Sequence, residues 1–288
     1  MKKRVAIGTA QFGSDYGINN KTGRLSDEEI NQVLNICSVN DISFLDTAYV
    51  YGDSEKRIGK YCEENKRYFS IITKLPDCNI NEFDKIFNDS LLRLKTDNVY
   101  GYLIHNINSF RKNPEIFNKL RKKKEAGKIK KIGFSLYNAD ELQMLFDIDF
   151  NFDLIQFPYN IFDRRFEPYF DTLKEKNVEI HTRSVYLQGL FFINPEELNI
   201  YFNSIKDKLD LLRKLSDRLG IRIQALCLSF VMKNKNIDKI VIGIDNKKQC
   251  LELIENENQI ENAFEYYDEL KKLKVEDINI LLPYKWKK

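Results

Sequence analysis

Eight short apolar segments alternate with helical patterns along the chain, and this alternation restricts the possible folds more than any other feature. Each segment is four or five residues long, which is typical of strands buried in a parallel sheet. The expected strands cover 5–8, 43–46, 70–74, 101–105, 131–135, 154–158, 178–182 and 239–243. Eight strands, each followed by a helix or a helical loop, predict an α/β fold of the (β/α)8 TIM barrel type.

Helical patterns fill the intervals between the expected strands. Ahead of the second strand, Ser26 precedes Glu29 by three residues, which is the spacing of a capping box at the start of a helix. The residues that follow form an apolar stripe at helical spacing, made up of Ile30, Val33, Leu34 and Cys37. A second helix start is expected at Asn138, a residue type that caps helices well.

The strand–helix pattern continues without a break, so we predict a single barrel domain over residues 1–288. TIM barrels reach this length as one domain, and the sequence contains no internal repeat, low-complexity linker or Pro/Gly-rich hinge. The weakest pattern lies at 189–203, which we interpret as a long loop over the barrel mouth. A doubly wound open sheet is the alternative fold, but its G-x-G-x-x-G phosphate-binding fingerprint is missing from the sequence.

The charge balance and the cysteines limit the kinds of partner and metal site that the sequence predicts. The chain has 46 basic and 43 acidic residues, and a net charge of +3 does not indicate a nucleic-acid or membrane partner. The apolar run at the N-terminus breaks at Gln11, too early for an export signal, and no run is long enough to span a membrane. Five scattered cysteines without a C-x-x-C pair argue against a disulfide framework and a zinc site. We therefore expect a cytoplasmic protein without a metal site, of open oligomeric state.

Polar residues suited to proton transfer stand at the carboxyl ends of three neighbouring strands. They are Asp46, Lys74 and His105, and Tyr51 lies in the loop that follows Asp46. Catalytic residues of TIM barrels gather at this end of the strands. Each of these residue types alone more often has a structural role. Four of them at one end of a barrel indicate a catalytic site.

The sequence resembles the aldo-keto reductase superfamily over nearly its whole length. The strongest match is FLDTAYVYGDSEKRIGK (44–60), which corresponds to the family signature D-T-A-x-x-Y-G followed by E-x-x-I/L-G. Further matching segments are IGTAQFG (7–13), IITKL (71–75), YLIHN (102–106), IGFSLYN (132–138), LIQFPYN (154–160) and RSVYLQGL (183–190). The resemblance implies that the catalytic tetrad of the family falls on Asp46, Tyr51, Lys74 and His105.

The resemblance also implies a reaction. Members of the superfamily move a hydride from C4 of a nicotinamide to the carbon of a carbonyl group, whose oxygen takes up a proton. Tyr51 would donate that proton, and the Lys74 ammonium would lower the pKa of the phenol from its usual value of about 10. Asp46 would pair with Lys74 and hold it in place, and His105 would hydrogen-bond the carbonyl oxygen and orient it.

The same resemblance implies a nicotinamide dinucleotide as cofactor. Ser135 and Gln156 match the residues that bind the carboxamide of the nicotinamide. Arg183 occupies the position of an aromatic ring that stacks on the nicotinamide, and a guanidinium plane is able to stack there as well. The adenosine end is expected at Gly243, Asn246, Lys247, Gln249 and Glu252. Gln249 replaces the arginine that usually binds the 2′-phosphate in the family. Because members of the family commonly use NADP(H), the resemblance still predicts NADP(H) over NAD(H).

The main hypothesis is an NAD(P)-dependent aldo-keto reductase that reduces a small aldehyde or ketone. Two alternatives remain: a non-catalytic nicotinamide-nucleotide-binding regulatory module on the same barrel, and an aldolase-type enzyme that forms an imine with Lys74. The loops expected to select the substrate are 12–24, 106–113, 159–166 and 186–203. Their Asn, Tyr and Phe residues, together with Arg164 and Arg165 in the third loop, favour a polar ligand such as a sugar or a sugar conjugate.

Overall fold

All eight predicted strands are present, and they form one closed parallel barrel in the computed structural model, which describes residues 1–286. The strands are β1 (Val5–Gly8), β2 (Phe44–Asp46), β3 (Ser70–Leu75), β4 (Val99–Ile104), β5 (Ile129–Ser135), β6 (Leu154–Pro158), β7 (Glu179–Arg183) and β8 (Lys239–Gly243). Each strand pairs in parallel with the next, and β8 closes the ring against β1. The predicted TIM barrel is therefore confirmed, and the open-sheet alternative is wrong.

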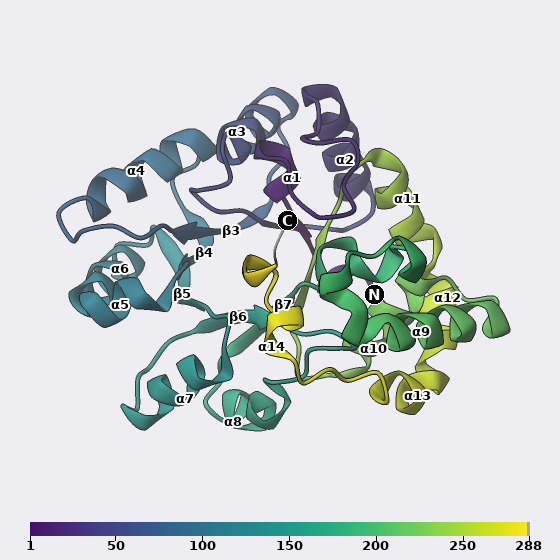
Figure 1. Ribbon diagram of the computed structural model, residues 1–288. Coiled ribbons are helices and arrows are strands. Elements are labelled where there is room, and N and C mark those ends of the chain that lie inside the picture. The colour runs from purple at the N-terminus through teal and green to yellow at the C-terminus, as the bar shows by residue number, and fades with distance from the viewer. Residues whose placement is uncertain (287–288) are drawn as a thin grey trace.

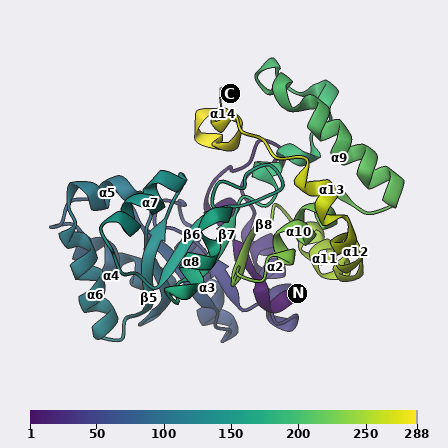
Figure 2. The same cartoon turned by 90° about the horizontal axis from the view of Figure 1, so that it is seen from below.

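Helices surround the ring of strands (Figures 1 and 2). The α-helices are α1 (Ala10–Gly13), α2 (Asp27–Val39), α3 (Ser54–Asn65), α4 (Phe83–Leu94), α5 (Ile107–Lys112), α6 (Glu115–Glu125), α7 (Ala139–Asp147), α8 (Phe170–Glu175), α9 (Lys206–Leu219), α10 (Ile223–Lys233), α11 (Lys247–Glu255), α12 (Glu257–Asn262), α13 (Tyr267–Lys271) and α14 (Ile278–Leu281). The capping box predicted from Ser26 and Glu29 begins α2. Asn138 is the N-cap of α7, also as predicted.

Two parts of the chain differ from the expectation. The expected loop at 189–203 contains three short 3₁₀ helices, namely η3 (Leu187–Phe192), η4 (Pro195–Glu197) and η5 (Ile200–Ile205). The Asn194 and Asn199 side chains accept backbone hydrogen bonds at the starts of η4 and η5 and thereby stabilise these two helices. The following helix, α9, was not predicted from the sequence.

An apolar layer lies inside the barrel, directly beneath the polar strand ends. It is a small, completely buried cluster made up of Ile72, Leu103 and Leu154. Side chains two residues apart in a strand share a face, and each member of the cluster stands two residues before a polar residue, namely Lys74, His105 or Gln156. A completely buried apolar layer therefore lies directly beneath the polar residues.

The C-terminal segment reaches the carboxyl end of the barrel. In Figures 1 and 2, α14 lies over this end of the strands. The ring of Tyr284 packs edge-on against Tyr137, which follows β5, with 5.2 Å between the centroids. The indole N–H of Trp286 donates to the carbonyl of Ile280 at 2.9 Å. This segment therefore borders the end of the barrel that carries the polar residues.

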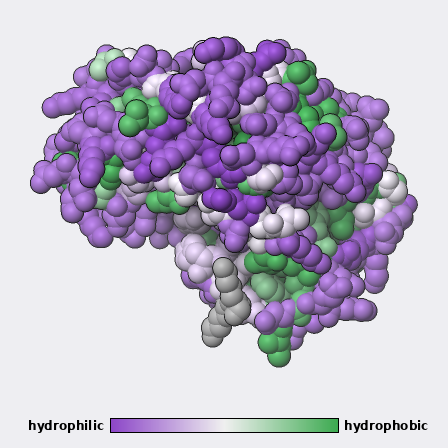
Figure 3. Space-filling model, turned by 90° about the horizontal axis from the view of Figure 1, so that it is seen from above, coloured by the Kyte–Doolittle hydropathy of each residue, from purple (hydrophilic) through white to green (hydrophobic). Residues whose placement is uncertain are grey.

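One face of the molecule is largely polar. Hydrophilic residues cover most of the face shown in Figure 3, and hydrophobic residues gather mainly at the lower right of that view. No helix within residues 1–286 is long and apolar enough to cross a membrane. The predicted domain, residues 1–288, includes two residues beyond the described part.

Candidate active site

A buried ion pair forms the centre of the site. The Nζ atom of Lys74 lies 2.6 Å from Oδ1 of Asp46 and donates to the carbonyl of Thr47 at 2.8 Å. The other carboxylate oxygen of Asp46 accepts from Nε2 of Gln156 at 2.7 Å. The side chains of Lys74 and Asp46 are only 1% and 5% exposed. Burial lowers the pKa of Lys74, and the Asp46 carboxylate opposes that change by favouring the ammonium.

The loop after β2 brings Tyr51 to this ion pair. Its ring centroid lies 5.4 Å from Nζ of Lys74 and 5.9 Å from the centroid of the His105 ring. The loop turns at Gly52, where φ is +55° and a Cβ atom would lie 2.2 Å from the carbonyl oxygen of Gly13. Only glycine fits both conditions. The four residues expected from the strand ends thus lie together.

The phenol of Tyr51 is set up to hold its proton. Burial and then the Asp46 carboxylate raise its pKa well above the usual value, while the Arg183 guanidinium opposes them. The sequence had led us to expect a lowered pKa, because Lys74 is nearby. The positive charge of Lys74 is, however, neutralised by Asp46 at 2.6 Å. Burial, with Lys74 and Arg183, lowers the pKa of His105 to about 3, so its imidazole is neutral at physiological pH.

Arg183 ends β7 beside these groups. Its guanidinium carbon lies 4.1 Å from the ring centroid of Tyr137, a cation–π contact. It donates to the carbonyl of Leu136 at 3.0 Å and to Oγ of Ser184 at 3.4 Å. It has no carboxylate partner among residues 1–286. Arg183 therefore leaves one uncompensated positive charge at this end of the barrel.

Ser135 and Gln156 are neighbours across the β5–β6 pair. Both side chains are buried. The Oε1 atom of Gln156 has no hydrogen-bond partner among residues 1–286, although its Nε2 atom is bound to Asp46. A buried amide oxygen without a partner is uncommon. The N–H₂ of a nicotinamide carboxamide is a donor that fits it, so these two residues suit the cofactor expected from the sequence.

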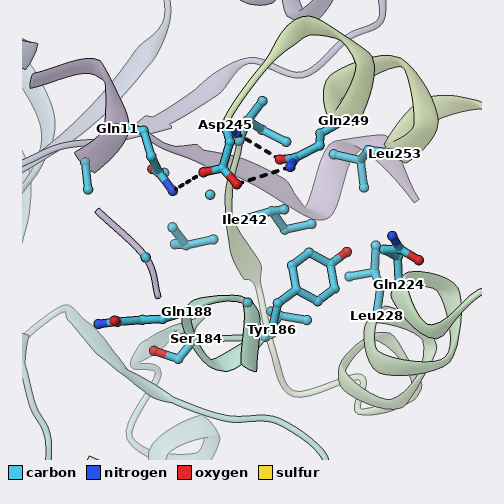
Figure 4. Close-up of a pocket in the computed structure, with 18 of the residues that line it drawn as sticks. Gln11, Ser184, Tyr186, Gln188, Gln224, Leu228, Ile242, Asp245, Gln249 and Leu253 are labelled. Carbon is cyan, nitrogen blue, oxygen red and sulfur yellow. Dashed lines mark hydrogen bonds between the residues drawn. The ribbon is translucent and has the colours of Figure 1, made fainter. Parts of the chain in front are cut away.

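A cavity of about 430 Å³ adjoins this site, and Figure 4 shows part of its lining. Asp46 and Tyr51 line it, and so do Asn256 and Ile260. Its volume is in the range of small-molecule and cofactor sites. Further lining residues come from the last residues of β7 and β8 and from the segments after β1 and β7, and include Gln11, Arg183, Tyr186, Gln188 and Gly243.

The segment after β8 lines part of this cavity. Asn246 caps α11 by accepting from the backbone N–H of Gln249 at 2.9 Å. Nε2 of Gln249 donates to Oδ2 of Asp245 at 3.1 Å, and its Oε1 accepts from the backbone N–H of Asp245 at 2.9 Å. Glu252 lines the cavity and lies 3.5 Å from Arg222. Lys247 is exposed and is not among the lining residues.

Two residues that line the cavity, Gln11 and Asp245, were not predicted from the sequence as site residues. Nε2 of Gln11 donates to Oδ1 of Asp245 at 3.0 Å (Figure 4). Gln11 follows β1 and Asp245 follows β8, and the two strands are adjacent only because the barrel closes. The sequence signal that could have identified this contact is a polar residue soon after the first strand together with another soon after the last strand.

The two arginines of the 159–166 loop do not line the cavity. Arg165 makes two hydrogen bonds to the buried carboxylate of Asp163, at 2.9 Å and 2.7 Å. Nε of Arg164 lies 3.9 Å from a carboxylate oxygen of Glu167. Both charges are thus engaged within the loop, and they lend no support to a polar substrate.

Comparisons with known proteins agree with this geometry. The model of the aldo/keto reductase family matches residues 4–278. Among solved structures, the holo form of an aldo-keto reductase from Bacillus halodurans is 19% identical, with a TM-score of 0.73 and coverage of 95% of this chain and 94% of that one. A thermostable aldo-keto reductase in complex with the inhibitor epalrestat is 20% identical, with a TM-score of 0.69 and coverage of 94% of both chains.

At this level of identity the solved structures show the shared barrel fold. No curated protein gives a significant match to the sequence. The family model, in contrast, spans the segments that hold the tetrad and the cavity. This chain therefore belongs to the aldo/keto reductase family.

Proposed function

We propose that the protein reduces an aldehyde or a ketone to an alcohol with NAD(P)H, and that Tyr51 donates the proton. The observation that carries this proposal is the buried Asp46–Lys74 pair with the Tyr51 and His105 rings beside it, next to a cavity of about 430 Å³ that Asp46 and Tyr51 line. Family membership implies NAD(P)H-dependent carbonyl reduction. The role of each residue is part of the proposal.

Each side chain has one task in this reaction. When bound, the reduced nicotinamide supplies the hydride for the carbonyl carbon. Tyr51, which holds its proton at neutral pH, transfers it to the carbonyl oxygen. The Lys74 ammonium stabilises the phenolate that remains, and Asp46 fixes Lys74 in position. His105, being neutral, donates an N–H to the carbonyl oxygen and orients the substrate.

The remaining predicted residues would hold the cofactor along the cavity. Ser135 and Oε1 of Gln156 suit the carboxamide, and Arg183 is close enough to the tetrad to contact the nicotinamide ring. The adenosine end is assigned to Gly243, Asn246, Gln249 and Glu252, which line the cavity, whereas Lys247 does not line it and is left out of this assignment. This assignment does not extend to a preference for NADP(H), because Gln249 is engaged with a carboxylate.

We further propose a substrate with an anionic group near its carbonyl, such as a negatively charged sugar conjugate. The charge of Arg183 supports this class, because no carboxylate among residues 1–286 compensates it. Together with Asp46 and Lys74, which neutralise each other, Arg183 gives the site a positive charge. A guanidinium binds carboxylates and phosphates through paired, charge-assisted hydrogen bonds.

The geometry speaks against an imine-forming enzyme. A nucleophilic lysine must be neutral, whereas Nζ of Lys74 lies 2.6 Å from a carboxylate and donates to a carbonyl. A purely regulatory nucleotide-binding module would need the cavity but not the tetrad. The complete tetrad therefore favours catalysis.

A turnover screen tests the proposed function. The protein is mixed with NADPH or NADH and a panel of aldoses, ketoses, sugar phosphates, nucleotide-linked sugars and simple aldehydes. Oxidation of the cofactor that depends on a carbonyl compound, with formation of the matching alcohol, is the expected result. Cofactor binding without turnover on any member would support the regulatory module. Trapping of a substrate on Lys74 by borohydride would support the aldolase.

A further inference from the structure

We infer that the carboxylate of Asp245 makes this enzyme select NAD(H) and reject NADP(H). The inference rests on the proposed function, since hydride transfer requires the nicotinamide to lie beside Tyr51. Tyr51 lines the same cavity as Asp245 and the α11 residues Lys248, Gln249 and Glu252. The proposed function puts the nicotinamide at Tyr51 and the adenosine at the segment after β8, where Asp245 and α11 lie.

Asp245 is held firmly in this part of the cavity. Gln11 donates to Oδ1 at 3.0 Å from one side, and Gln249 donates to Oδ2 at 3.1 Å from the other (Figure 4). The Gln249 amide also accepts from the backbone N–H of Asp245. Two neutral amides thus fix the carboxylate, and each uses its donor group to do so.

The negative charge of Asp245 has no cationic partner within residues 1–286, since no lysine or arginine of this range forms an ion pair with it. The second carboxylate of this segment, Glu252, lies 3.5 Å from Arg222 and 3.9 Å from Lys248. Lys248 also lines the cavity, but its side chain is 84% exposed, so solvent screens its charge. The fixed charge of this part of the cavity is therefore the carboxylate of Asp245.

A fixed anion distinguishes the two cofactors by chemistry. NADP(H) carries a phosphate on the 2′ oxygen of its adenosine ribose, and a carboxylate beside that phosphate repels it. NAD(H) carries a hydroxyl there, which is a hydrogen-bond donor that a carboxylate accepts. The helix start of α11 would favour a bound anion. Beside this helix start, however, the protein supplies an anion of its own, the carboxylate of Asp245.

Gln249 reinforces the selection. An arginine at this position would offer a forked donor to a phosphate. The glutamine instead has both atoms of its amide bound to Asp245. The backbone N–H of Gln249 is bound to the side chain of Asn246, so it is not free for a phosphate either. The residues that would have to bind the 2′-phosphate are therefore used to hold a carboxylate.

The test is direct titration of the protein with NADH and with NADPH, followed by fluorescence or calorimetry in one buffer. The wild type is expected to bind NADH about 10-fold or more tightly than NADPH, the scale of one unfavourable charge contact. Asp245→Asn keeps an oxygen and the size of the side chain but removes the charge. It should tighten NADPH by about 10-fold and change NADH by less than about threefold.

Asp149→Asn is the matched control, because it removes the same charge from a side chain that is 83% exposed and does not line the cavity. It should leave both dissociation constants unchanged. A wild type that binds NADPH as tightly as NADH, or an Asp245→Asn variant that changes both cofactors equally, would overturn the inference. Failure of both cofactors to bind would instead refute the proposed function.

Salt dependence tests the same point without a variant, should Asp245→Asn not fold. Salt screens the repulsion between Asp245 and a 2′-phosphate. The ratio of the NADPH to the NADH dissociation constant should therefore fall as salt is added. A ratio that rises with salt would show that the 2′-phosphate is attracted to its site, and would also overturn the inference.

Discussion

Replacement of Lys74 by methionine tests whether the buried ion pair with Asp46 stabilises the fold and supports hydride transfer. Methionine has similar length and no charge, so it keeps most of the packing. Asp46 would lose a partner at 2.6 Å and keep only its hydrogen bond from Gln156. Breaking one side of a buried pair costs about 3–5 kcal/mol, since the remaining charge is left without water. We expect the free energy of unfolding to fall by that amount at neutral pH.

The matched control is Lys119→Met. Nζ of Lys119 also lies 2.6 Å from a carboxylate, that of Asp84, but the two side chains are 32% and 50% exposed. An exposed pair of this kind contributes no more than about 1 kcal/mol. Urea unfolding of both variants compares the same substitution at the same distance and different burial. Equal losses of stability in the two variants would refute the reasoning.

A double variant sharpens the test, because Asp46→Asn removes the buried carboxylate that Lys74→Met leaves without its ion-pair partner. Adding Asp46→Asn should restore most of the loss at neutral pH. Hydride transfer in a single turnover should collapse in Lys74→Met, while the dissociation constant of the cofactor changes little.

Further predictions concern other charges of the barrel. Burial opposes the ionisation of Glu179, but hydrogen bonds from His181 and Tyr100 outweigh it and lower its pKa to about 2. Its contribution, at most about 3 kcal/mol, is present above about pH 4.5 and is lost as the pH falls towards 2. The unfolding curves of wild type and Glu179→Gln should therefore converge in acid, and a constant difference in stability would contradict this. At saturating cofactor, Arg183→Met should raise KM for anionic carbonyl compounds about 10-fold or more relative to that for neutral ones; equal effects on both classes would exclude Arg183 from substrate selection.

The sequence predicted the barrel because the strands are buried on both sides. Such strands are short apolar runs, and all eight were located within about two residues of their ends. His105 lies one residue beyond β4, and Lys74 lies inside β3, yet both face the site as expected. The helix α9 was missed, although its buried leucines, Leu209, Leu212 and Leu215, recur at helical spacing. Its remaining residues are mostly charged, and they hid the pattern.

The electrostatics of the site could not be read from the sequence. The residue types of the tetrad predicted their grouping, but the raised pKa of Tyr51 depends on burial and on the short Asp46–Lys74 contact. Gln11 and Asp245 are separated by nearly the whole chain and meet only because β1 pairs with β8. The pairing of Arg165 with Asp163 likewise depends on the folded loop. Each of these features depends on distances between side chains and on their exposure to solvent, which only the folded chain defines.

The central claim is that Tyr51 donates the proton in a carbonyl reduction. The most direct measurement is single-turnover oxidation of bound NADH or NADPH by a carbonyl substrate, compared between the wild type and Tyr51→Phe. The phenylalanine keeps the ring beside Lys74 and His105 and removes only the hydroxyl. We predict that the variant binds the cofactor as the wild type does and transfers hydride about 10²–10⁴-fold more slowly. Hydride transfer at close to the wild-type rate in Tyr51→Phe would contradict the claim.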